Sequence, residues 1–307
     1  MRRGSHAGKP AVAVSLALLL GGCAQNVADE RATLADLLPP AVQNAPTGAT
    51  SLELVERAIA EERIDDARRL LDRLRVSEPD SPRQRLAQAE LALAAGQIKP
   101  AHDRFAFLVD DPTVGARALQ GLGIAKLLLG QRAEGRASLE RALAIDPSLW
   151  RAWNGVGYAH DSEQRFIEAI EAYGKAIVAK PDYAIAYNNR GFSLLMQRQV
   201  EEAVSDLNRA LSLDPRLVTA KQNLRLAVAW RGDYAAALIG VERKDMGRAL
   251  NNIGYIALMR GDLAAAEAYL MRAMEVDPSY NETAARNLAY LRSIKGLDPG
   301  APARPRG

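Results

Sequence analysis

The side chain with the most reactive chemistry is Cys23, the single cysteine among 307 residues. It follows the apolar run Ala11–Leu20, interrupted only by Ser15, and a pair of glycines. A thiolate is a good nucleophile, which makes this residue a candidate for covalent acylation. A lone cysteine excludes an intrachain disulfide and zinc sites of the Cys₄ or Cys₂His₂ type.

The other residue types that catalyse reactions or bind metals are too dispersed to form a site. His6, His102 and His160 are the only histidines, and they lack the spacing of metal ligands. Gly121 and Gly123 lack the third glycine of a dinucleotide-binding loop and follow no strand pattern. We therefore expect no enzymatic activity, no catalytic residue, no cofactor, no metal and no small-molecule substrate.

The net charge of +3 is carried by the first 22 residues, which hold Arg2, Arg3 and Lys9 and no acidic residue. Without this segment the 40 basic residues become 37, equal to the 37 acidic ones. Nucleic-acid binding requires clustered positive charge. We therefore expect no nucleic-acid partner.

Amide, aromatic and arginine side chains recur at a fixed interval of 34 residues. Amides stand at Gln120, Asn154, Asn188 and Gln222, and again at Asn251; arginines stand at Arg117 and Arg151; aromatic rings stand at Tyr158 and Phe192. An amide both donates and accepts, so a series of amides can bind the backbone of an extended peptide. The aromatic rings would anchor its apolar side chains, and the arginines would bind an acidic group.

The same interval separates the residues that shape helices. Spacings of 34 relate Gly123, Gly157 and Gly191, then Ala142, Ala176 and Ala210, then Pro147, Pro181 and Pro215. Small residues let two helices approach closely, and proline ends the second helix. The pattern is similar to the tetratricopeptide repeat (TPR), with Trp153, Gly157, Ala169, Tyr173 and Pro181 in the best-matching unit.

This resemblance implies an all-α fold, a TPR superhelical solenoid of antiparallel helix pairs that ends in a C-terminal capping helix. In this fold the second, fifth and ninth positions of each first helix face a concave groove. The predicted partner-binding residues are Arg117, Gln120, Arg151, Asn154, Tyr158, Asn188, Phe192, Gln222, Asn251 and Tyr255. The alternative for the amides, and above all for the asparagines at the sixth position, is packing between repeats.

The predicted organisation has six parts. They are a signal peptide (1–22), a lipidated flexible tether (23–47), degenerate TPR-like hairpins (48–115), a TPR array (116–280) whose unit 218–246 is truncated, a capping helix (281–295) and a disordered tail (296–307). In the truncated unit Arg225 replaces the glycine, and we expect a shortened second helix. The run Ala11–Leu20 is too short to cross a bilayer, although a buried helix or a membrane stub is an alternative to the signal peptide.

Residues Leu20–Cys23 resemble the lipobox of bacterial lipoproteins, which implies cleavage before Cys23, acyl chains on Cys23 and attachment to a membrane. Ala24 follows in place of aspartate, and by analogy this favours the outer membrane, facing the periplasm.

The lipobox and the order of the repeats resemble the TadD-type lipoproteins of the tight-adherence (Flp) pilus system. The degenerate unit that begins Lys221-Gln222-Asn223-Leu224, followed by Asn251-Asn252-Ile253-Gly254, carries this likeness together with units 116–217. The resemblance implies a non-catalytic scaffold that helps to assemble or localise an outer-membrane secretin, with secretin or pilus-assembly subunits as partners. The alternative is a periplasmic lipoprotein that scaffolds peptidoglycan enzymes.

Overall fold

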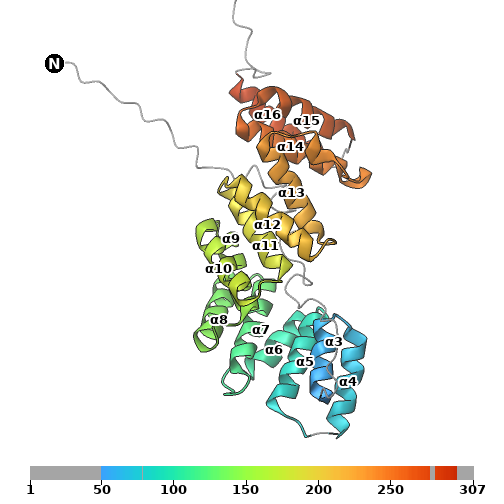
Figure 1. The fold of residues 1–307 in the computed structure, drawn as a ribbon, viewed down its shortest axis with the longest axis vertical. Helices are drawn as coiled ribbons and strands as arrows, with labels where there is room; N and C mark the ends of the chain where they lie inside the picture. The colour runs from blue at the N-terminus through green and yellow to red at the C-terminus, as the bar shows by residue number, and fades with distance from the viewer. Residues whose placement is uncertain (1–49, 78, 277–280, 296–307) are drawn as a thin grey trace, which may run out of the picture. The chain divides into compact units, whose positions relative to one another are not determined.

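The computed structural model describes residues 50–77, 79–276 and 281–295, and these ranges contain α-helices and no strand (Figure 1). The α-helices are α3 (Ser51–Ala60), α4 (Ile64–Ser77), α5 (Pro82–Ala94), α6 (Ile98–Ala106), α7 (Gly115–Leu128), α8 (Arg132–Ile145), α9 (Trp150–Ser162), α10 (Phe166–Ala179), α11 (Ala184–Met196), α12 (Val200–Leu213), α13 (Val218–Arg231), α14 (Met246–Arg260), α15 (Leu263–Val276) and α16 (Asn281–Ile294). None of these helices is long and apolar enough to cross a membrane. The predicted signal peptide, tether and tail lie outside the described residues.

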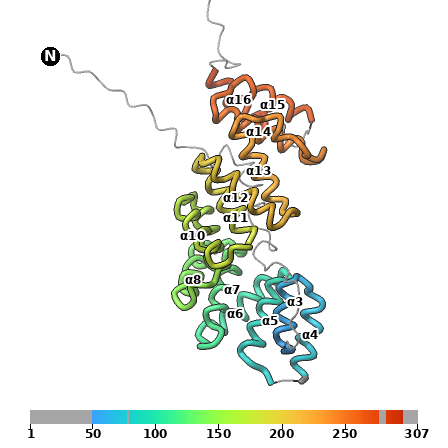
Figure 2. The backbone as a smooth tube through the Cα atoms, viewed as in Figure 1, coloured from blue at the N-terminus to red at the C-terminus, as the bar shows by residue number. Residues whose placement is uncertain are grey.

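The described residues form two compact units, 50–224 and 225–295, divided within α13. In the first unit, successive helices pack as antiparallel pairs, from α3 with α4 to α11 with α12 (Figure 2). Each first helix also contacts the first helix of the next pair, as α7 does with α9. This is the stacking of a TPR solenoid, so the predicted fold class is confirmed.

Glycines at the helix crossings set how closely the paired helices approach. A Cβ on Gly123 of α7 would lie 2.6 Å from Cγ of Leu139 and 2.9 Å from the carbonyl oxygen of Gly135, both on α8. A Cβ on Gly191 of α11 would similarly lie 2.9 Å from Cγ of Leu207. Both leucines are fully buried. The recurring glycine thus leaves room for the side chain that fills the core of each pair.

Each first helix ends on a residue in the left-handed conformation, always at the same place in the repeat. These residues are Glu62, Gly96, Gly130, Gln164, Arg198, Gly232 and Gly261, with φ between 57° and 100°. The first six are 34 residues apart, and the last follows after 29. The hairpins in 48–115 therefore use the same turn as the repeats in 116–217, although their sequences diverge.

Gln164→Gly should stabilise the first unit by about 1 kcal/mol, because a left-handed conformation strains a residue with a Cβ and suits glycine. The midpoint of urea unfolding measures this change. Gln197→Gly, at the preceding turn position of the next repeat where φ is −88°, is the control and should not stabilise. Equal midpoint shifts for both variants would contradict the argument.

In the second unit, the truncated repeat lacks an α-helical second arm. Two 3-10 turns, η2 (Ala236–Leu238) and η3 (Arg243–Asp245), stand where a shortened helix was expected. Arg225 explains part of this difference, because its guanidinium donates to the carbonyl of Gly240 at 3.0 Å. A side chain thus occupies the position where glycine would admit a second helix.

The pair α14 and α15 is covered by the single helix α16. Leu291 of α16 is fully buried with Ala257 and Ala266, while Ala284 is buried with Leu250. Lys295, at the end of α16, forms an ion pair with Glu267 at 2.6 Å. The last helix therefore caps the apolar edge of the pair, as a solenoid requires.

Candidate functional site

The ten predicted groove residues all lie on first helices, eight in the first unit and two in the second. Six of them are buried, namely Gln120, Asn154, Asn188, Phe192, Asn251 and Tyr255. The half-buried ones are Arg117, Arg151, Tyr158 and Gln222. Cys23, the predicted lipidation site, lies outside the described residues. Partner binding by these side chains stays a prediction.

The asparagines form a hydrogen-bonded chain between repeats of the first unit. Nδ2 of Asn223 donates to Oδ1 of Asn188 at 3.0 Å, and Nδ2 of Asn188 donates to Oδ1 of Asn189 at 3.1 Å. Nδ2 of Asn189 in turn donates to Oδ1 of Asn154 at 3.1 Å. The amide at the sixth position therefore binds the amide at the fifth position of the preceding repeat. Within each repeat the first helix of the next is held in place by these bonds.

The second unit repeats this contact once. Nδ2 of Asn287 on α16 donates to Oδ1 of Asn251 on α14 at 3.1 Å, and both residues are buried. Packing between repeats is thus what these amides do within the chain.

Asn188→Ala should lower the free energy of unfolding by about 1–2 kcal/mol, because Asn223 would keep a buried donor without an acceptor. Gln197→Ala, which removes an exposed amide on the same helix end, should change stability by less than about 0.5 kcal/mol. Urea unfolding measures both. Full stability of the Asn188 variant would show that the chain of amides does not hold the repeats together.

Ionic side chains on the first helices also connect successive repeats. Arg83 of α5 pairs with Glu56 of α3 at 2.8 Å. Arg117 of α7 pairs with Glu90 of α5 at 2.9 Å and with Glu56 at 3.3 Å. In each first-named pair the arginine follows its glutamate by 27 residues, from the ninth position of one repeat to the second position of the next. The sequence interpretation missed these glutamates, although the interval was a usable signal.

These pairs separate the arginines that were predicted to bind an acidic partner. Arg117 is already bound by two glutamates of its own chain, and Arg248 pairs with Asp245 at 3.0 Å. Arg151 has neither kind of contact among the described residues, and its Nε is buried without a hydrogen-bond partner. Its guanidinium carbon lies 4.8 Å from the ring centroid of Trp150.

The pKa values of the two half-buried arginines move in opposite directions. Burial alone lowers the pKa of Arg117, but the charges of Glu90 and Glu56 outweigh it and raise the pKa above its ordinary value. Burial lowers the pKa of Arg151, and the more distant Glu90 does not compensate. Arg151 stays protonated because guanidinium is so strongly basic. It is therefore a desolvated positive charge without a close counter-ion.

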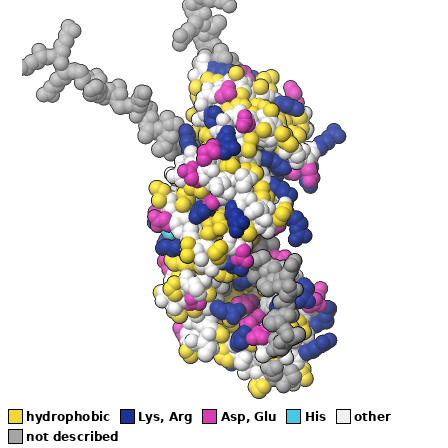
Figure 3. All heavy atoms as spheres, viewed as in Figure 1, with side chains coloured by type: hydrophobic (Ala, Val, Ile, Leu, Met, Phe, Trp, Pro, Cys, Tyr) yellow, Lys and Arg dark blue, Asp and Glu magenta, His cyan; other side chains and the backbone are white. Residues whose placement is uncertain are grey.

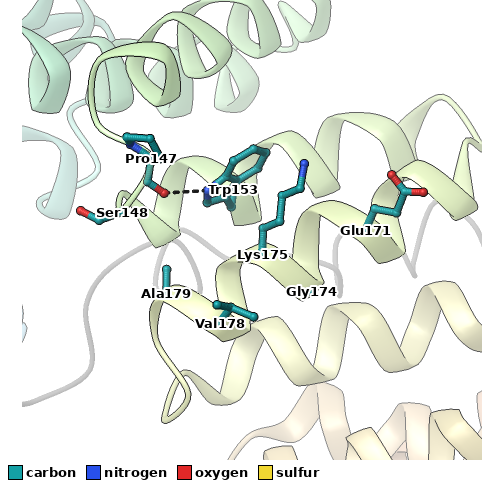
Figure 4. A pocket seen from close by; sticks show the side chains of 8 residues that line it. All are labelled: Pro147, Ser148, Trp153, Glu171, Gly174, Lys175, Val178 and Ala179. Carbon is teal, nitrogen blue, oxygen red and sulfur yellow. Dashed lines mark hydrogen bonds between the residues drawn. The ribbon is translucent and has the colours of Figure 1, made fainter.

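A separate open hollow of about 680 Å³ lies beside Trp153 (Figure 4). The indole Nε1 donates to the carbonyl of Pro147 at 2.9 Å, and Nζ of Lys175 lies 4.4 Å from the ring centroid. Val178, which is 82% exposed, lines the hollow as well. None of the ten predicted groove residues lines it.

The charges on the surface are of mixed sign, with acidic and basic side chains interspersed among hydrophobic ones on the face that Figure 3 shows. Among residues 50–77, 79–276 and 281–295, no group of three or more His, Cys, Asp or Glu side chains is placed to hold a metal ion.

Family models recognise the repeats at the predicted positions. The model described as TPR repeat matches residues 162–198, and models described as tetratricopeptide repeat match residues 184–217, 116–149 and 247–280. The matched ranges agree with the predicted unit boundaries 116–149, 184–217 and 247–280.

Curated relatives match through the same region. The peroxisomal targeting signal receptor of Candida albicans is 34% identical over 27% of this chain and 14% of its own length. The tetratricopeptide repeat-containing protein trd-1 of Caenorhabditis elegans is 25% identical over 59% of this chain and 23% of its own length. A probable UDP-N-acetylglucosamine–peptide N-acetylglucosaminyltransferase, SPINDLY, of Hordeum vulgare is 27% identical over 55% and 19%. The chain thus spans less than a quarter of the length of these relatives.

Solved structures agree in fold. The Cut9–Hcn1 hetero-tetramer of the APC/C has a TM-score of 0.52 at 17% identity, covering 80% of this chain and 50% of the other. YrrB, a TPR protein whose title describes an unusual peptide-binding site, has a TM-score of 0.48 at 19% identity, covering 59% and 96%. TPR stacks typically form binding surfaces and not catalytic centres. Residues 116–149, 162–217 and 247–280 are therefore tetratricopeptide repeats, and they make this chain a TPR protein-interaction scaffold.

Proposed function

We propose that this scaffold is anchored in the outer membrane by acyl chains on Cys23, faces the periplasm, and helps to assemble or localise a pilus or secretion apparatus. The observation that carries the proposal is the sequence Leu20-Gly21-Gly22-Cys23, placed ahead of a TPR array. Lipid on that cysteine would hold the array beside the membrane in which a secretin ring assembles. The array binds the secretin or a pilus-assembly subunit and performs no chemistry itself.

A second function fits the same observation. A lipid-anchored array in the periplasm can also hold peptidoglycan hydrolases or synthases. The mixed-sign surface and the buried amides suit either partner, so the identity of the bound protein separates the two functions.

The test is cross-linking of the tagged, full-length protein in native membranes, followed by purification and identification of the attached proteins. Secretin or pilus-assembly subunits are the expected result. Peptidoglycan enzymes without any pilus component would overturn the first function and establish the second. A parallel sample that carries Leu139→Ala, which should destabilise the array, is the control for contacts that do not depend on the folded repeats.

The anchor has its own test. Cys23→Ser should release the protein from the membrane fraction, since stable attachment requires the acyl chains. Ala24→Asp should keep the protein in membranes but move it to the inner-membrane fraction of a density gradient. Membrane attachment of the Cys23 variant equal to that of the wild type would contradict the lipid anchor.

A further inference from the structure

We propose that Arg151 and Asn154 of α9 form a subsite for the carboxylate of an acidic side chain in the partner protein. This rests on the proposed function as a scaffold, and it assigns the chemistry of the partner at one place on the array. The partner presents a glutamate or aspartate in an extended segment against the first helices of the first unit.

The arginine pairs of the preceding repeats show what is missing at Arg151. Arg83 finds Glu56, and Arg117 finds Glu90, in each case 27 residues earlier. The residue 27 positions before Arg151 is Ile124, which is buried and has no charge. The third arginine of the series therefore lacks the carboxylate that its two predecessors receive from their own chain.

Asn154 lacks a partner for a related reason. In the next repeat, Nδ2 of Asn188 donates to the asparagine beside it, Asn189. In α9 that neighbouring position is Gly155, which has no side chain, and Nδ2 of Asn154 is buried without an acceptor. Its Oδ1 is already used by Asn189 at 3.1 Å. Only donor capacity remains at this amide.

The two orphan donors lie on one face of α9. Residues three apart on a helix are neighbours, so Asn154 stands one turn beyond Arg151 on the same side. Two buried donors, one of them charged, favour an acceptor with negative charge. The charged groups that act on Arg151 are Glu90, which attracts it, and Arg117, which repels it. Because Glu90 is held by both ends of its bond to Arg117, it does not fill the subsite.

The pairs within the chain also indicate that the ligand is a side chain and not a free anion. At Arg117 the same repeat position accepts a glutamate carboxylate delivered by a neighbouring helix, with N–O distances of 2.9 and 3.0 Å. A partner segment lying along the first helices presents its carboxylate in the same way. Half-buried Tyr158, one turn further along α9, offers an apolar surface beside it.

The test is a titration of the full-length protein in detergent, observed through arginine Nε–H NMR resonances. The probe is the capped pentapeptide acetyl-Ala-Ala-Glu-Ala-Ala-amide, and its matched control carries Gln in place of Glu. The signal of Arg151 is assigned as the resonance that Arg151→Gln removes. We expect it to shift saturably with the Glu peptide and to require about tenfold more of the Gln peptide. Asn154→Ala should weaken the Glu peptide about fivefold, and the Arg117 resonance should not move.

Ile124→Glu supplies the missing carboxylate within the chain. In this variant the Arg151 resonance should already be shifted, and the Glu peptide should no longer bind. Ile124→Gln is its matched control and should still bind the peptide.

Three results would overturn the proposal. They are an equal response to the Glu and Gln peptides, no response to either, and inorganic phosphate binding as tightly as the Glu peptide, which would indicate a site for free anions. Binding that appears only after Asp29→Asn, Glu30→Gln and Asp36→Asn are combined would assign the subsite to this chain's own N-terminal segment. The titration needs no partner, so it can succeed or fail independently of the cross-linking experiment.

Discussion

Gly157→Ala is expected to lower the free energy of unfolding of the first unit by about 3 kcal/mol. The new Cβ would lie 2.6 Å from Cε1 of Tyr173 and 2.8 Å from two further ring atoms. The ring cannot move aside easily, because Tyr173 is 1% exposed and its hydroxyl donates to Asp161 at 3.0 Å. The steric cost therefore exceeds the gain of about 1 kcal/mol that alanine normally brings to a helix.

Gly174→Ala is the matched control. It lies inside α10, the helix that packs on α9, and its Cβ would meet only a guanidinium nitrogen of Arg190 at 3.8 Å. This variant should be more stable by about 0.5–1 kcal/mol. Tryptophan fluorescence during urea unfolding, in a Trp230→Phe background, reports only Trp150 and Trp153 in the first unit. Shifts of the same sign for both glycines would refute the steric argument.

Leu139→Ala is expected to destabilise the first unit by about 4 kcal/mol. Leu139 is fully buried between α7, α8 and α9, and its atoms fill the space left by two glycines. A Cβ on Gly123 would lie 2.6 Å from its Cγ, and a Cβ on Gly155 would lie 2.7 Å from its Cδ1. Because those glycines carry no side chain that could swing into the void, the truncation leaves a cavity. Leu139→Met, which nearly conserves volume, should cost less than about 1.5 kcal/mol.

The same contact predicts a compensating pair. The nearest atom to a Cβ on Gly155 belongs to Leu139, and the next side chain, Leu127, is 3.6 Å away. Gly155→Ala should therefore destabilise the wild-type protein but restore stability in the Leu139→Ala background. A double-mutant cycle by urea unfolding measures this coupling, expected at about 1–2 kcal/mol in favour of the double variant. Strict additivity of the two changes would mean that Leu139 does not fill this space.

The repeat pattern predicted the fold because its signals are local. Glycine, alanine and proline at intervals of 34 residues specify where a hairpin begins, how closely its helices approach and where it ends. Even the divergent hairpins of 48–115 keep the turn, with left-handed residues at Glu62 and Gly96. The truncated repeat was expected from a spacing of 63 between Pro215 and Pro278. Its two 3-10 turns were not, because they depend on where the Arg225 side chain finds an acceptor.

The candidate site was predictable only in part. The sequence gave no means to separate Arg117, Arg151 and Arg248, since all three stand at the same position of a repeat. Arg117 is bound by Glu56, 61 residues earlier in the chain, and this contact exists only when α3, α5 and α7 are stacked. Arg151 is unpaired because the equivalent stacking brings it opposite Ile124 and not a glutamate.

The sequence by itself determined the period, the helix pairs and the turns, since each depends on residues close together along the chain. The tertiary structure decided which polar groups remain available. Asn188, Asn189 and Asn223 satisfy one another across repeats, while Asn154 keeps an orphan donor beside Gly155. A hydrogen bond or ion pair between repeats depends on the distance between helices, and packing alone sets that distance.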